Sequence, residues 1–205
     1  MPRNNLPTVD AYLACLPEGI ASYPDAAVKG SVLASRRNHP GFDQLLKDGN
    51  LPEPAVRLLR DPPTATSWVP EVAFNTVMAA LYDVVFRENG GPAAYEEWSA
   101  EQNARLLRTP LYRILFAVVS PERLLVAASA RWAAFRRGTS VAVLDHDRST
   151  MSFRLTCPPN LYPPVGLHAF SAAFRAATQA AGGRVTVIEW TAESPAAVRW
   201  HIEWV

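Results

Sequence analysis

Cysteine is scarce in this chain of 205 residues, in which Cys15 and Cys157 are the only two. Two thiols in a chain of this length make no disulfide framework, so a reducing compartment is the simplest inference. The first ten residues contain one arginine and no apolar run, which is unlike a signal peptide. No apolar run approaches the ~20 residues that cross a bilayer. We therefore expect a cytoplasmic protein with no membrane span.

An excess of charge of one sign is also lacking. The chain has 20 basic and 19 acidic residues, a formal net charge of +1. Proteins that bind nucleic acid or acidic membranes through their net charge carry a clear basic excess, so we expect no nucleic-acid partner. Lysine is nearly absent, since only Lys29 and Lys47 occur. A codon bias towards arginine and alanine explains this better than phosphate recognition does.

Motifs of catalysis and metal binding are missing as well. There is no Gly-x-Ser-x-Gly elbow, no glycine-rich phosphate loop and no Cys-x-x-Cys or His-Glu-x-x-His spacing. Asp145, His146 and Asp147 offer ligand atoms, but they are consecutive residues of a predicted turn, where aspartate commonly bonds the backbone. Cys157 ends the apolar face of a predicted strand, where a small buried hydrophobe is the default and a reactive thiol the alternative. We expect no metal site and no enzyme.

The last third of the chain, residues 139–205, has the clearest pattern. Apolar residues alternate with polar ones over 150–157 and again over 198–204, which is typical of strands with one buried face. Strands are also predicted over 140–144 and 184–190, and an amphipathic helix over 166–180. The sequence therefore predicts an α+β fold, in which a helical layer packs on a four-stranded antiparallel sheet made of two hairpins, a C-terminal ββαββ unit.

The preceding residues are predicted to be mostly helical. Residues 1–25 are punctuated by proline and predict an N-terminal arm with one short helix over 9–16, capped by Thr8. Residues 26–205 are then one α+β domain. Its helices are predicted over 26–38, 42–47, 53–59, 68–86, from 92 up to Pro110, and over 120–137, with a buried segment at 111–119. Gly138 suits the left-handed position that ends the last of these helices.

Aromatic residues gather on the predicted inward faces of the helices and the sheet. They indicate a packed core or, alternatively, a mostly apolar pocket between the layers, which is how many small-ligand sites are built. The proline-rich loop 158–164 is a natural rim for such a pocket, where Tyr162 has a hydroxyl to offer. The candidate ligand-binding residues are Trp132, Phe135, Phe153, Cys157, Tyr162, Phe170, Phe174 and Trp200.

Four stretches of the chain carry a family resemblance. They are LPEGIASYPDAAVKGSVL (16–33), TPLYRILFAVVSPERLLVAASARWAAFRRGTSVAVL (109–144), LYPPVGLHAFSAAFRAA (161–177) and VRWHIEW (198–204). They resemble a paralogous family of uncharacterised myxobacterial proteins over roughly 16–205. That family is similar in layout to a ligand-binding superfamily of haem nitric-oxide sensors, 4-vinyl-reductase domains and small subunits of the TRAPP vesicle-tethering complex.

The resemblance implies a fold and a role more than a set of site residues. The haem sensors use a proximal histidine and a Tyr-x-Ser-x-Arg motif, and this chain has no such motif. The 4-vinyl-reductase domains often carry clustered Cys or His, and Cys157 with His168 is a weak match to such a cluster. The acyl-binding cysteine of the TRAPP subunits has no matched position here. The implied fold is helices against an antiparallel sheet, and the implied role is sensing of a small molecule or lipid, or partner docking.

Two functional hypotheses follow. The first is a non-catalytic sensory or regulatory domain that holds a small apolar ligand or lipid between helices and sheet, with no cofactor specified. The alternative is a protein-interaction module without ligand, with a protein partner or a second copy of the chain as a homodimer. The nearly neutral surface of arginine and glutamate favours the alternative.

Overall fold

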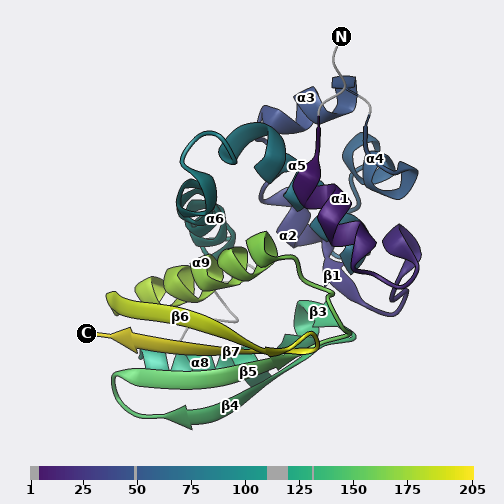
Figure 1. Ribbon diagram of the computed structural model, residues 1–205. Helices are drawn as coiled ribbons and strands as arrows, with labels where there is room; N and C mark the ends of the chain where they lie inside the picture. Colours follow the sequence, from purple (N-terminus) through teal and green to yellow (C-terminus); the bar gives the residue numbers. More distant parts are fainter. Residues whose placement is uncertain (1–4, 49, 110–119, 131) are drawn as a thin grey trace.

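The protein is described by a computed structural model that covers residues 5–48, 50–109, 120–130 and 132–205 (Figure 1). The predicted buried segment 111–119 and the predicted break at Pro110 lie outside these ranges. Helices from the N-terminal half stand over a C-terminal antiparallel sheet, so the α+β prediction is confirmed. None of the described helices is long and apolar enough to cross a membrane.

The C-terminal sheet has the predicted pair of hairpins. Its strands are β4 (Ser140–His146), β5 (Thr150–Thr156), β6 (Val185–Ser194) and β7 (Ala197–Trp204), in the order β4-β5-β7-β6 with every pair antiparallel. The two hairpins meet at the β5–β7 ladder, where Phe153 lies opposite Trp200. Alternate residues of both strands are buried, which confirms the faces predicted from the pattern: Met151, Phe153, Leu155, Val198, Trp200, Ile202 and Trp204.

Helix α9 (Pro164–Ala180) connects the hairpins and covers this face of the sheet. It packs against α6 (Gly91–Leu107) on one side and α8 (Pro121–Ala130) on another, while α8 also contacts β4. Phe170 and Ala177 of α9 are buried, as its amphipathic pattern predicts. Two hydrophobic clusters result, one between α9 and the sheet and the other among the N-terminal helices.

The second cluster surrounds α5 (Glu71–Leu81), every residue of which is buried. α5 contacts α1 (Pro7–Ala14), α3 (Gly41–Asp48) and α4 (Glu53–Arg60), and it continues into a π-helical stretch, η2 (Tyr82–Phe86). α2 (Gly30–Ala34) contributes Val32 and Leu33 to the same cluster. The predicted short helices at 42–47 and 53–59 are confirmed as α3 and α4. A mostly apolar helix is expected at the centre of such a bundle.

A small three-stranded sheet replaces three predicted helix ends. Strand β1 (Ala27–Lys29) pairs with β2 (Trp68–Pro70) on one side and β3 (Arg136–Arg137) on the other. The predicted helices over 26–38, 68–86 and 120–137 are therefore wrong at these positions. In the third, α8 ends at Ala130 and a 3₁₀ turn, η3 (Trp132–Ala134), leads into β3.

The reason is long-range pairing that overrides local helix preference. Val28 is fully buried opposite Val69, and the amide of Gly30 donates to the carbonyl of Ser67 at 2.9 Å. A side chain at Gly30 would collide with the backbone carbonyl of Thr64, so this junction requires glycine. Gly138 has the predicted left-handed conformation (φ +72°), but it follows a strand rather than a helix.

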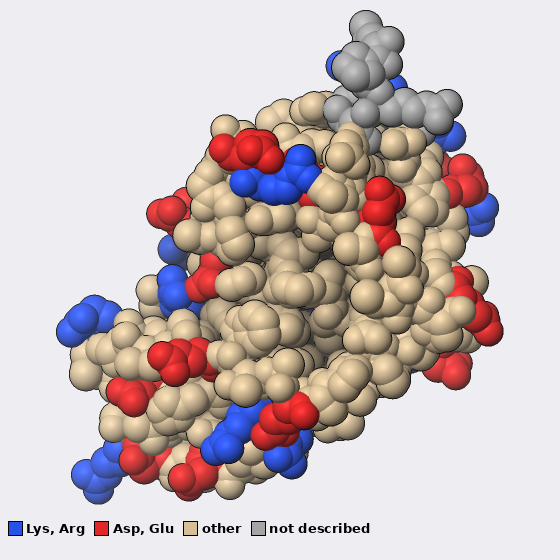
Figure 2. All heavy atoms as spheres, in the orientation of Figure 1, with Lys and Arg blue, Asp and Glu red and all other residues tan. Residues whose placement is uncertain are grey.

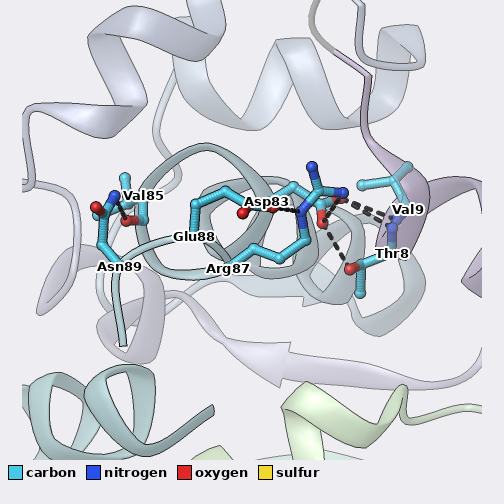
Figure 3. Close-up of polar contacts among 7 residues, drawn as sticks. All are labelled: Thr8, Val9, Asp83, Val85, Arg87, Glu88 and Asn89. Carbon is cyan, nitrogen blue, oxygen red and sulfur yellow. Dashed lines mark hydrogen bonds and ion pairs between the residues drawn. The ribbon is translucent and has the colours of Figure 1, made fainter. Parts of the chain in front are cut away.

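Helix α1 of the predicted N-terminal arm is held by a residue from η2. Asp83 accepts hydrogen bonds from the backbone amides of Thr8 (3.0 Å) and Val9 (3.4 Å) and from the Thr8 hydroxyl (2.6 Å) (Figure 3). The helix begins at Pro7, and Thr8 lies inside it, so the prediction that Thr8 caps a helix over 9–16 is wrong. Because the capping carboxylate lies 75 residues away along the chain, the sequence around the helix does not indicate it.

Candidate functional site

A cavity of about 160 Å³ lies between the helical layer and the sheet. Its walls come from α5, α6 and α9 on the helical side, from β4 and β5 on the sheet side, and from η3 and the start of β3 at one end. Most of the lining is aliphatic or aromatic, for example Met78 of α5, Leu106 of α6 and Met151 of β5. Such a lining arises because the apolar faces of three separately predicted elements converge here without filling the space.

Six of the eight sequence-predicted residues line this cavity: Trp132, Phe135, Phe153, Tyr162, Phe170 and Phe174. Two of the ring contacts among them are edge to face, a geometry that aromatic rings favour. Phe153 meets Phe174 with ring centroids 4.3 Å apart, and Phe170 meets Tyr162 at 4.9 Å. The structure thus brings these rings together around one space, and their role as ligand contacts remains a prediction.

Trp200 and Cys157 lie outside the cavity lining. Trp200 is fully buried in the sheet's core, stacked on Phe153, and its indole nitrogen donates to the Ser171 hydroxyl at 3.1 Å. Cys157 is buried just beyond the end of β5. Burial raises the pKa of its thiol to about 11, an effect that Glu71 reinforces. Since the thiolate is the nucleophile, this raised pKa disfavours the reactive form of Cys157 at neutral pH.

The prediction of a turn over Asp145, His146 and Asp147 is wrong for the first two, because pairing with β5 extends β4 through His146 and the turn begins at Asp147. The Asp147 carboxylate accepts from the amides of Ser149 (2.7 Å) and Thr150 (2.8 Å), which lowers its pKa. His146 instead contacts Glu122 at 3.0 Å. Within the described part of the chain no three His, Cys, Asp or Glu residues gather in a way that would hold a metal ion.

One buried ion pair at the cavity was not predicted from the sequence. Glu71, at the start of α5, is fully buried and pairs with Arg136 of β3, and Arg136 also donates to the Tyr162 hydroxyl at 3.5 Å. Burial raises the pKa of the Glu71 carboxyl, and the adjacent guanidinium opposes that rise. The pair joins the small sheet to the cavity wall. The pattern of the sequence held no sign of it, because both residues belong to segments predicted as helix ends.

A second buried arginine, Arg36, lines the cavity just beyond α2. Its guanidinium donates to the carbonyl of Val32 (2.8 Å) and to the side-chain oxygen of Asn103 on α6 (3.0 Å). The side-chain nitrogen of Asn103 is buried and has no hydrogen-bond partner in the part of the chain that the structure describes. Arginine and asparagine are usually exposed, so neither residue could be placed here from the sequence pattern.

A separate groove of about 550 Å³ opens on the surface between α1, the end of the proline-rich loop and the start of α9. No Lys, Arg, Asp or Glu belongs to its described lining. Figure 2 shows a hollowed, uncharged centre on this face, with charged residues towards the edges. Tyr162 lines both this groove and the inner cavity. The predicted rim at 158–164 thus contributes to the wall between them.

No family model and no curated protein matches the chain. Its fold is similar to that of H-NOX (haem nitric-oxide sensor) proteins. A mutant of the Fe(II) unliganded H-NOX protein from K. algicida has a TM-score of 0.55 at 9% identity, over 86% of this chain and 96% of that one. A variant of Tt H-NOX has a TM-score of 0.53 at 8% identity, over 86% and 94%.

An oxygen-binding H-NOX domain related to soluble guanylate cyclases, solved as its oxygen complex, has a TM-score of 0.50 at 9% identity, over 85% of this chain and 91% of that one. At such identities the likeness concerns the fold alone. The predicted resemblance in layout to the haem nitric-oxide sensors is confirmed at that level.

Proposed function

We propose that this protein is a non-catalytic sensory or regulatory domain that holds a small, mostly apolar ligand in the cavity between its helices and its sheet. The observation that carries the proposal is a cavity of about 160 Å³ lined chiefly by apolar side chains. The H-NOX-like fold supports it, because the similar domains include one that binds oxygen.

The size of the cavity indicates the size of the ligand. Sites for drug-sized molecules usually measure ~300–1,000 Å³. An engineered apolar cavity of ~150 Å³ in another protein stays dry and binds benzene or xenon. A space of about 160 Å³ therefore suits a molecule of one ring or a short branched chain. A ligand bound there supplies van der Waals contacts that the side chains lining the cavity otherwise lack.

The residues of the cavity do not fit haem. Haem iron is held by histidine, cysteine, methionine with histidine, or tyrosine. Neither histidine nor cysteine occurs among the described lining residues. Tyr95 and Tyr162 line the cavity, but burial raises the pKa of both phenols, that of Tyr95 to about 12, which disfavours the phenolate that iron binds. We therefore propose a ligand other than haem.

Binding is proposed to be non-covalent and without turnover. Cys157, the thiol with which a covalent acyl ligand would have to react, does not line the cavity and has a raised pKa. The charged groups at the cavity are engaged in hydrogen bonds to protein atoms. Ligand binding in the cavity is proposed to affect the N-terminal half through the small sheet, because η3 and β3 line the cavity and β3 pairs with β1.

Titration calorimetry with toluene, a neutral probe of one ring, tests the proposal. We expect saturable 1:1 binding to the wild type. Ala173→Leu places extra carbons in the cavity from α9, and we expect it to abolish binding. Ala180→Leu changes an exposed residue of the same helix and should leave binding intact. An absence of binding to folded wild-type protein would overturn the proposal and favour the interaction-module alternative.

A further inference from the structure

Arg36 is a buried cation whose hydrogen-bond partners among residues 5–48, 50–109, 120–130 and 132–205 are all neutral. Only 5% of its surface is exposed. Its acceptors are the carbonyl of Val32 at 2.8 Å, the Ser35 hydroxyl at 3.1 Å and the side-chain oxygen of Asn103 at 3.0 Å. Among the described side chains no carboxylate lies within ion-pair distance of Arg36. Residues 110–119, outside the described ranges, contain no Asp or Glu in their sequence.

Arg136, the other arginine that lines the cavity, has the carboxylate partner that Arg36 lacks among the described residues. It is paired with the buried carboxylate of Glu71, as a buried charge normally must be. Tyr95, the phenol near Arg36, supplies no negative charge, because burial raises its pKa to about 12. Burial lowers the pKa of Arg36 to about 10, which still leaves the guanidinium charged at neutral pH. The cavity therefore has an uncompensated positive charge in its wall.

Asn103 adds a second donor beside this charge. Its side-chain oxygen is occupied by Arg36, which fixes the orientation of the amide. Its side-chain nitrogen then has no acceptor among the described residues, although Asn103 is only 7% exposed and lines the cavity. A buried donor without a partner is unfavourable and rare in folded proteins. A guanidinium and an amide N–H therefore lie side by side, and both lack an acceptor of negative charge.

We propose that the ligand of this cavity is a small apolar carboxylate, whose carboxylate group accepts hydrogen bonds from Arg36 and Asn103 and whose apolar body fills the rest of the space. This inference rests on the proposed function and specifies its ligand class. A carboxylate matches the site because it is planar and carries one negative charge, and because it can accept two N–H bonds from the fork of a guanidinium. A phosphate dianion would bring a second charge that nothing here compensates.

The first test compares three ligands of one ring on the wild-type protein by titration calorimetry: toluene, benzamide and benzoate. We expect benzoate to bind at least about tenfold more tightly than benzamide, because a hydrogen bond between charged groups is stronger than a neutral one. Equal or weaker binding of benzoate would overturn the inference, while toluene binding would show that the proposed function survives. If none of the three binds, the proposed function fails with it.

The second test removes the charge. Arg36→Met keeps a long side chain, and we expect it to lose the preference for benzoate over benzamide while toluene still binds. Arg37→Met is the matched control, since Arg37 is the next residue but bonds the carbonyl of Leu59 and pairs with Asp43. That variant should keep the preference. A preference retained in folded R36M would overturn the inference, and if R36M does not fold, the wild-type series decides alone.

Discussion

Phe153 of β5 and Phe174 of α9 meet edge to face, with their ring centroids 4.3 Å apart. This contact joins helix and sheet at the border of the cavity. Phe153 also stacks on Trp200, its neighbour across the β5–β7 ladder, nearly parallel at 5.6 Å. Phe153 and Phe174 line the cavity, whereas Trp200 is fully buried and does not line it. Substitutions in the packed core and at the cavity should consequently have different effects.

Trp200→Ala should strongly destabilise the protein. The side chain is fully buried and donates a hydrogen bond to Ser171, so its removal leaves a large hole and takes away the donor that the Ser171 hydroxyl accepts from. We expect a loss of about 3–5 kcal/mol in the free energy of unfolding, measured by urea denaturation. Trp190→Ala, at a half-buried position opposite Trp200 in the sheet, should cost clearly less. Equal losses would contradict a packed core at Trp200.

The pair of Glu71 and Arg136 predicts a non-additive effect on stability. Arg136→Met leaves the Glu71 carboxylate buried and alone, which should cost about 3–5 kcal/mol in urea denaturation. The double variant with Glu71→Leu removes both charges and should recover a large part of this loss. A double variant as unstable as the sum of the two single variants would show that the two charges do not compensate each other.

Asp83 should control the docking of α1. Asp83→Ala leaves the amides of Thr8 and Val9 without their acceptor, and losing a helix cap typically costs about 1–2 kcal/mol. We expect faster hydrogen exchange at these two amides than in the wild type. Asp10→Ala, which removes an exposed acid from the first turn of the same helix, should not change it. Unchanged exchange in D83A would exclude a capping role.

The two cysteines should differ sharply in reactivity. Cys15 is exposed, whereas Cys157 is buried with its pKa raised to about 11. Iodoacetamide at neutral pH should therefore modify Cys15 first, with Cys157 at least about a hundredfold slower because so little of it is thiolate. Peptide mass spectrometry after timed quenching gives both rates. A fast reaction at Cys157 in folded protein would reopen the alternative of a reactive thiol.

The four-stranded sheet could be predicted because its strands are seven to ten residues long, enough to show alternation. The three-stranded sheet could not be predicted. Strands β1, β2 and β3 have three, three and two residues, and they pair across about forty to over one hundred positions of the chain. Segments this short have no period of their own. Their conformation is decided by partners that a local pattern does not include.

The residues of the candidate site likewise fall into those that could be predicted from the sequence and those that could not. Its aromatic residues, such as Phe153 and Phe170, could be predicted because each lies on the inward face of a regular element. Arg36 and Asn103 could not, since polar residues are expected at the surface, and these two are buried where the segment after α2 meets α6 through their mutual hydrogen bond. Whether inward faces enclose a space or fill it depends on how closely the helices approach the sheet, which no single segment determines.

The central claim, a ligand cavity between helices and sheet, is most directly tested at Met78 and Met151. Both line the cavity from opposite sides, one on α5 and the other on β5. In protein labelled with ¹³C at the methionine methyl groups, toluene is predicted to shift both signals saturably, and Ala173→Leu to abolish the shifts. Signals of Met78 and Met151 that stay unmoved at saturating toluene would contradict the cavity as a binding site.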